Sequence, residues 1–267
     1  MRYGARPWLL YAFAAAVYLF LYAPIIHVVV NSFNADQSLI GWGGFTLDWY
    51  RRIWAHPAVL EGTRNSLIIG LSVTALSVAI GTSAAVSSQR APRWLRSLMD
   101  SLTYARIIMP ELVLALALLI YMAAINIPRG FVGTILGHTV WASAYVTVIV
   151  QARLAGRDPA TDEAARDLGA TRWRTFWRVT LPEILPAVVA GGLLVFAFSF
   201  EDVVTSYFLA GDKNTLPIVI LSLIRYEVNP GVNAIGAALI ALTGVVLFPY
   251  LLINWRTLTA PAARRRA

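Results

Sequence analysis

The sequence predicts an all-α integral membrane protein, a single domain over residues 1–267 with six transmembrane helices. Hydrophobic residues make up 58% of the chain and charged residues only 13%, about half the charged fraction of an ordinary soluble domain. A soluble fold of this length needs a polar surface, which long uncharged runs cannot supply. These runs are too long for barrel strands, so each is expected to be a helix.

Six apolar segments are long enough to cross a hydrocarbon core of about 30 Å. They cover residues 8–30, 66–88, 98–124, 131–152, 186–210 and 231–255. The first is too long for the apolar region of a signal peptide and shows no clear cleavage site, so it is expected to remain as a helix.

Two shorter elements are expected between these spans. Residues 47–54 have the spacing of a short amphipathic helix that lies at the membrane interface, with tryptophan as its anchor. The apolar residues 217–224 are too few to span a bilayer. We expect them to form a partly re-entrant element that faces the outer mouth.

The distribution of positive charge predicts that both termini are cytoplasmic. If the N-terminus is inside, most of the 22 lysines and arginines fall in inside segments, and Arg106 lies within the third span. The net charge of +8 and the pI near 10.1 come from arginines beside apolar runs rather than from one basic face. Nucleic-acid binding is therefore not indicated.

The inside segment between the fourth and fifth spans, residues 153–185, has the pattern of two short helices joined by a turn. Asp158 suits an N-cap and Pro159 the first helical position. Gly169 can adopt the left-handed conformation that ends a helix. The run Thr180-Leu181-Pro182-Glu183 has the pattern of a capping box that would open the fifth span.

A second short helix over residues 171–178 would carry an aromatic ridge, made by Trp173, Phe176 and Trp177 at spacings of three and four. Such a ridge fits a groove on another protein. The alternative is that the two helices form an amphipathic pair that lies on the lipid surface.

This loop also contains a long spaced pattern. It consists of Glu-Ala-Ala, three residues, Gly, nine residues, an aliphatic residue, one residue and Leu-Pro, met by Glu163, Ala164, Ala165, Gly169, Val179, Leu181 and Pro182. The chain thereby resembles the permease subunits of ABC importers. The resemblance implies the type I ABC importer permease fold and a loop that docks in a cleft of a cytoplasmic ATPase. The residues implied in this coupling are Glu163, Ala164, Ala165, Gly169, Trp173, Phe176, Leu181 and Pro182.

The resemblance extends through the chain and is greatest to the second permease subunit of the spermidine/putrescine class. It is carried by residues 22–25 with 31–34, 44–50, 201–209, and 216–217 with 229–234. It implies a polyamine or another cationic amine as cargo. The same subfamily includes importers of other small solutes, so an amino acid, a phosphonate or a sugar remains an alternative.

The partners that the resemblance implies are two ATPase subunits, a second homologous permease subunit and an extracytoplasmic solute-binding protein. Whether the second permease is a different chain or another copy stays open. The implied location is the bacterial cytoplasmic (inner) membrane, which the chain crosses several times. The implied mechanism is alternating access, in which ATP binding moves the coupling helices and switches the paired permeases.

Ionisable residues within spans are costly and usually face a cavity or a partner. Four stand in the predicted spans: Arg106, Glu111, Glu201 and Asp202. Together with Tyr104 and Thr205, the three acids are the candidate translocation residues. A cavity with net negative charge would favour a cationic solute. The structural alternative is that Arg106 neutralises one acid and that Glu201 or Asp202 caps a broken helix or contacts the partner permease.

No catalytic or metal site is predicted. The single lysine, Lys213, lies in an outer loop, and the chain has no phosphate-binding Gly-x-x-x-x-Gly-Lys-Ser/Thr motif, so ATP and Mg are expected in the partner ATPase. The chain has no cysteine, and the lone histidines His27 and His138 have no second ligand at helical spacing. An ion-coupled secondary carrier is the remaining alternative, but such carriers usually show internal repeats, and none is found here.

Overall fold

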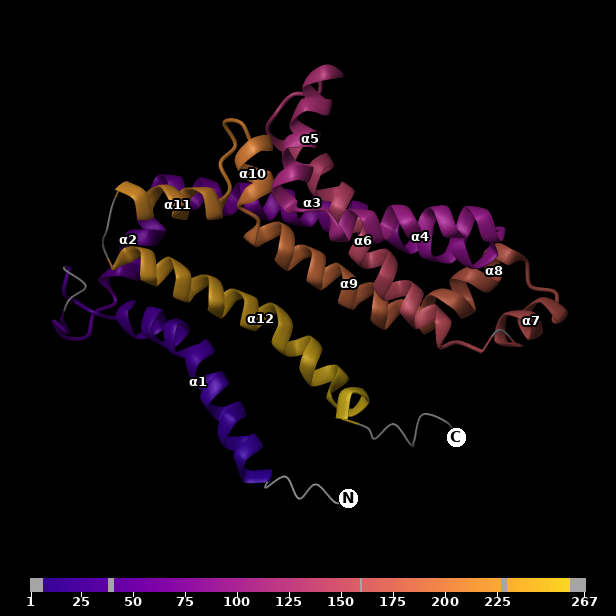
Figure 1. Ribbon diagram of the computed structural model, residues 1–267, viewed down its shortest axis with the longest axis horizontal. Coiled ribbons are helices and arrows are strands. Elements are labelled where there is room, and N and C mark those ends of the chain that lie inside the picture. The colour runs from indigo at the N-terminus through magenta and orange to yellow at the C-terminus, as the bar shows by residue number, and fades with distance from the viewer. Residues whose placement is uncertain (1–6, 38–40, 159, 227–229, 260–267) are drawn as a thin grey trace. The chain divides into compact units, whose positions relative to one another are not determined.

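The structure is a computed structural model that describes residues 7–37, 41–158, 160–226 and 230–259, and these residues form helices without a β-strand. The predicted all-α class is therefore confirmed (Figure 1). The chain divides into two compact units, one drawn from residues 1–60 and 220–245 and the other from 61–219 and 246–267. Pro159 and the arginines at the two chain ends lie outside the described residues.

The first unit contains α1 (Pro7–Asn31), α2 (Asp48–Ala55) and the beginning of α12 (Gly231–Thr259). The side chains of α1 are apolar on all sides of the helix, and most of them are not covered by other parts of the chain. This is expected for a helix in contact with lipid or another subunit. The predicted amphipathic helix is confirmed as α2, which buries Trp49 and Ile53. The Trp49 indole donates a 2.8 Å hydrogen bond to the carbonyl oxygen of Asn34.

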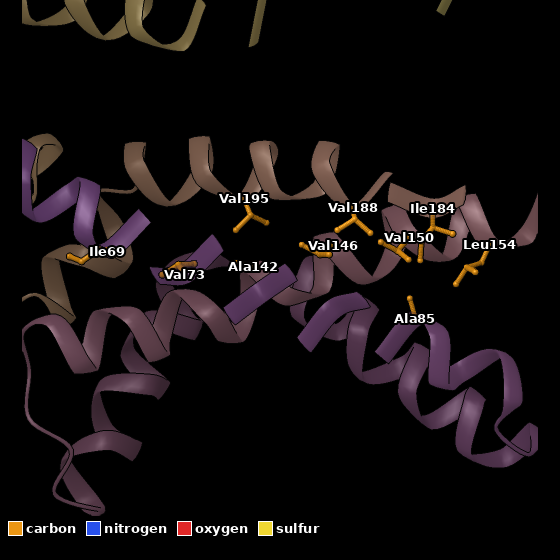
Figure 2. Close-up of a cluster of buried hydrophobic side chains, with 10 residues drawn as sticks. All are labelled: Ile69, Val73, Ala85, Ala142, Val146, Val150, Leu154, Ile184, Val188 and Val195. Atoms are coloured by element: carbon orange, nitrogen blue, oxygen red, sulfur yellow. The ribbon is translucent and has the colours of Figure 1, made fainter. Parts of the chain in front are cut away.

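Three long helices form the core of the second unit: α3 (Pro57–Arg90), α6 (Phe131–Ala155) and α9 (Leu181–Glu201). Figure 2 shows the buried side chains between them, which apart from Leu154 are alanine or β-branched residues such as Val73, Val146 and Val188. At Gly81 of α3, a Cβ atom would lie only 2.7 Å from the carbonyl oxygen of Ser143. The close approach of α3 and α6 therefore requires glycine at this position.

The third predicted span, residues 98–124, is wrong as a single helix. The structure contains α4 (Arg93–Ile108) and α5 (Glu111–Ala124), bent by 109° relative to each other. Pro110 lacks a backbone N–H and disfavours the helical conformation at the residue before it, and Met109 accordingly has an extended ψ of 130°. The break places Glu111 in the first turn of α5.

The fifth predicted span, residues 186–210, is also interrupted. Asp202 has an extended ψ of 127° and separates α9 from the short α10 (Val204–Leu209). At the other end, α8 (Arg172–Thr175) passes through the π-helical turn η1 (Phe176–Thr180) into α9, which makes one helix of 30 residues from Arg172 to Glu201.

The predicted capping box at Thr180 is therefore wrong. Thr180 has helical backbone angles (φ −65°, ψ −53°) and its side chain makes no cap hydrogen bond. Because the helix runs through this position from α8, the backbone N–H groups at Thr180 are not at a helix start and need no cap.

Among the described residues, four helices are long and apolar enough to cross a membrane, and the bent pair α4 and α5 makes a fifth if it counts as one span. The four are α1, α3, α6 and the helix from Arg172 to Glu201. The sixth predicted span corresponds to α12, whose side chains are described as far as Val245. The apolar residues 217–224 form most of α11 (Leu216–Tyr226), a short apolar helix.

Candidate coupling loop and translocation cavity

The loop after α6 folds locally as its sequence predicts. The Asp158 carboxylate accepts a 3.0 Å hydrogen bond from the backbone N–H of Ala160, at the start of α7 (Ala160–Asp167). Gly169 has a φ of +83°, and its N–H donates to the carbonyl oxygen of Arg166 at 2.8 Å. The left-handed glycine thus ends the helix, and this prediction is confirmed.

The candidate coupling residues present an exposed surface with apolar side chains. Within α7, Glu163 and Ala164 are exposed and Ala165 is half-buried, while Leu168 beyond it is 90% exposed. The aromatic ridge continues this surface, with Trp173 71% exposed and its ring centroid 5.5 Å from that of Trp177.

The remaining candidate residues of this loop adjoin that surface. Phe176 is half-buried in η1, and its ring packs against Trp177 with the centroids 5.4 Å apart. Leu181 is half-buried and Pro182 is exposed in the first turn of α9. Large exposed apolar side chains grouped in this way are typical of a protein-binding surface.

Arg157, two residues after the end of α6, joins this loop to α9. Its Nε atom lies 2.6 Å from Glu183 Oε2 in the first turn of α9, and its Nη2 atom lies 2.9 Å from Asp162 Oδ1 in α7. The hydroxyl of Thr180 also donates to Asp162, at 3.2 Å. One guanidinium therefore bridges carboxylates from two different helices.

The charges of this cluster stabilise one another. Burial alone would raise the pKa of Asp162, but the hydrogen bond and positive charge of Arg157 lower it below the ordinary value. Burial likewise opposes the charge of Arg157, while its two carboxylate partners raise its pKa. Both groups are therefore ionised at neutral pH.

A second candidate site is a cavity of about 500 Å³ where the two helix breaks meet α6. Its walls include the ends of α4 and α9 and the beginning of α5, and it is lined by Arg106, Ile107, Met109, Glu111, Leu114, Trp141, Tyr145, Phe198, Glu201, Asp202, Val203 and Val204. Three carboxylates and one guanidinium thus share a cavity with aromatic walls. Such a site can hold a cation by charge and its methylene groups by apolar contact.

Asp202 has a structural role in addition to its place in the cavity wall. Its carboxylate accepts hydrogen bonds from the backbone N–H groups of Thr205 (3.3 Å) and Ser206 (2.7 Å), at the beginning of α10. It also lies 3.0 Å from Nε2 of His138, whose other ring nitrogen is 2.8 Å from the hydroxyl of Ser199. The predicted alternative, an acid that caps a broken helix, is therefore present at Asp202.

The other candidate residues of the pathway differ in their positions. Glu111 and Glu201 line the cavity together with Asp202. Neither Thr205 nor Tyr104 lines the cavity. Thr205 is buried, and Tyr104 on α4 is 49% exposed.

Arg106 contacts the backbone of α6. Its Nη1 atom donates to the carbonyl oxygen of Val140 at 3.1 Å and to the hydroxyl of Ser143 at 3.2 Å. The ion pairs found among the described residues do not include it. The structural alternative, in which Arg106 neutralises one of the acids, is therefore not supported by a direct ion pair among the described residues.

Two residues of these sites were missed by sequence reasoning. Arg157 was considered only among the basic residues of an inside segment, and His138 only as a possible metal ligand, whereas it lies fully buried within α6 beside Asp202 and Ser199. For His138 a signal was available, because a histidine inside an apolar run must find polar partners.

Comparison with known proteins gives similarity over most of the chain. The family described as "Binding-protein-dependent transport system inner membrane component" matches residues 77–257. The spermidine/putrescine transport system permease protein PotC of Haemophilus influenzae is 35% identical over 233 residues, which cover 87% of this chain and 91% of that protein. The putrescine transport system permease protein PotI of Escherichia coli K12 is 34% identical over 239 residues, which cover 86% and 85%.

A solved structure shows the same fold. It is a bacterial ABC transporter involved in the import of the acidic polysaccharide alginate, with a TM-score of 0.68 at 17% identity. The match covers 96% of this chain and 97% of that chain.

Proposed function

Because this chain belongs to the family of binding-protein-dependent transport system inner membrane components, we propose that it forms one half of the membrane pathway of an ATP-driven importer for polyamines. The other half would be a second homologous permease, either a different chain or a second copy. Two ATPase subunits would bind ATP and Mg on the cytoplasmic side, and an extracytoplasmic binding protein would deliver the solute.

The observation that carries the choice of cargo is the grouping of Glu111, Glu201 and Asp202 around one cavity. Polyamines are flexible cations with apolar methylene segments between the charges. The carboxylates would attract the ammonium groups, increasingly so as water is excluded. The aromatic rings of Trp141 and Tyr145 in the same cavity offer faces to a cation or to methylene groups. The relatives named as spermidine/putrescine and putrescine permeases support the same choice.

The proposed cycle is alternating access. ATP binding would close the two ATPases and move the surface formed by α7 and the aromatic ridge. The paired permeases would then open outward to receive the solute, and hydrolysis would return them to the inward-facing state. This proposal places both termini and α7 in the cytoplasm, because most of the basic residues lie in the corresponding segments.

The experiment that tests the cargo uses the binding protein that works with this permease. Its melting temperature is measured with spermidine, putrescine, amino acids, sugars and phosphonates, because a ligand stabilises the protein that binds it. The complex is then reconstituted in liposomes, and ATP-dependent uptake of the solute that gives the largest shift is measured. The proposal predicts that a polyamine stabilises the binding protein and is taken up. Stabilisation by an uncharged sugar alone, with uptake of that sugar, would contradict it.

A further inference from the structure

We propose that Arg157 is a positioning residue that fixes α7 to the first turn of α9, so that a displacement of α7 is carried into the helix that lines the cavity. This inference rests on the proposed function only in taking α7 as the part that the ATPase moves. It does not depend on the identity of the solute.

None of the side chains of α7 is buried, and its last residues lead to Leu168, which is 90% exposed. A helix of eight residues is too short to be stable by itself. The helix lies beside α8 and η1, which continue into α9. Polar links must therefore contribute much of what holds α7 to this long helix.

The polar links have a defined geometry. The Arg157 guanidinium reaches Asp162 in α7 with Nη2 at 2.9 Å and Glu183 in α9 with Nε at 2.6 Å. The hydroxyl of Thr180 donates to the same Asp162 carboxylate at 3.2 Å. Asp162 is thus tied to the π-helical turn directly and to α9 through Arg157.

The Arg157 side chain is only 8% exposed, while those of Asp162 and Glu183 are 17% and 35% exposed. Exposed ion pairs are weak, whereas a guanidinium enclosed between two carboxylates has a defined geometry and resists separation. Arg157 also follows the C-terminus of α6, where the helix dipole favours a positive charge. The guanidinium is therefore held by α7 and α9, at a point in the chain just beyond α6.

Lysine cannot replace Arg157 fully. The planar guanidinium directs separate N–H groups at two acceptors, and an ammonium group offers one point of charge. Arg157→Lys should retain the charge and the assembly of the complex, but it should lose part of the link. Arg157→Met removes the link and keeps much of the side-chain volume.

The absence of cysteine from the chain makes a direct measurement simple. Spin labels are attached to Ala152→Cys in α6 and Asp167→Cys in α7, both at exposed positions, in the assembled complex. Distances between the labels are measured by double electron–electron resonance. We expect a narrow distribution for the parent, one at least twice as wide for Arg157→Met, and an intermediate width for Arg157→Lys. The control is Arg96→Met, which breaks the exposed 4.0 Å ion pair with Asp100 and should leave the width unchanged.

Transport gives the functional readout. The number of solute molecules imported per ATP hydrolysed should fall at least fivefold in Arg157→Met and by less than twofold in Arg96→Met. A purely structural role predicts less intact complex with an unchanged ratio, and that result overturns the inference. So does a parent-like distance distribution in an intact Arg157→Met complex. If that variant does not assemble, a parent-like width and ratio in Arg157→Lys overturn it. A parent complex that imports no polyamine refutes the proposed cargo and leaves the distance measurement interpretable.

Discussion

The imidazole of His138 lies 3.0 Å from the carboxylate of Asp202, with both side chains buried between α6 and the break that separates α9 from α10. Ser199 and Ser206 complete the polar cluster, at 2.8 Å and 3.3 Å from the two ring nitrogens. Asp202 therefore belongs both to the cavity wall and to the frame that shapes it. Neutralising this residue would change two properties at once.

Glu201 and Asp202 should consequently respond differently to neutralisation. Glu201→Gln removes a negative charge from an exposed position of the cavity wall and should slow polyamine uptake at least threefold, mainly through a higher KM. Asp202→Asn should slow uptake and also lower the melting temperature of the complex, because the amide replaces an acceptor that serves two backbone N–H groups and His138. The cost is expected to be about 1–3 kcal/mol.

Uptake kinetics and thermal unfolding of both variants separate these effects. If Glu201→Gln transports within twofold of the parent, the charge of Glu201 has no part in cargo attraction. Equal melting temperatures for Asp202→Asn and the parent would contradict the capping role.

His138 should stabilise the helix break through its two ring nitrogens. His138→Ala leaves buried polar groups of Asp202 and Ser199 without this partner, which should cost about 1–3 kcal/mol. His138→Asn can replace one of the two contacts and should recover part of the loss. Melting temperatures of the purified complex test this order of parent, Asn and Ala. An alanine variant as stable as the parent would show that the cluster is not required.

Local signals in the sequence were reliable where neighbouring residues determine the structure. Asp158 caps α7, Gly169 ends it, and residues 48–55 form the amphipathic α2. Each depends on a backbone conformation or a spacing within one or two turns. Pro110 accounts for the break in the third predicted span, but the 109° angle of the bend depends on packing that a single apolar run does not specify.

Relationships between distant residues could not be predicted in this way. Arg157 meets Glu183 across 26 positions, and Ser206 meets His138 across 68. At Thr180 a local pattern gave a wrong prediction, because the capping-box sequence is present but α8 continues through it into α9. The local sequence is compatible with either a helix start or a continuous helix, and the helices on both sides of Thr180 determine which one forms.

Gly169 should tolerate only residues that accept a positive φ. Its φ is +83°, and a Cβ atom there would meet no atom within 4 Å, so the cost of substitution is backbone strain and not a clash. Gly169→Val should destabilise the turn by about 1–3 kcal/mol and reduce ATP-driven uptake at least fivefold. Gly169→Asn, which enters the left-handed region more easily, should retain most of the activity. Normal uptake by the valine variant in an intact complex would contradict a role for this helix end.

The proposed orientation can be tested by cysteine labelling. Leu168 is 90% exposed and Trp42 58% exposed, so a cysteine at either position is reachable from its own side of the membrane. In intact spheroplasts a membrane-impermeant maleimide should label Trp42→Cys and not Leu168→Cys, and both should react after lysis. Labelling of Leu168→Cys before lysis would reverse the orientation and remove α7 from the ATPase side.

The unbroken helix from Arg172 to Glu201 has a mechanical consequence. It contains 30 residues, with the aromatic ridge at one end and a cavity carboxylate at the other, and a helix of that length is about 45 Å long. A rod of this length turns a small rotation into a useful movement, since tilting it by about 5° around its midpoint shifts each end by about 2 Å in opposite directions. A push on Trp173 toward the bundle would thus swing Glu201 the other way, reduced by any bending at the π-helical turn and at Pro186, which lie between them.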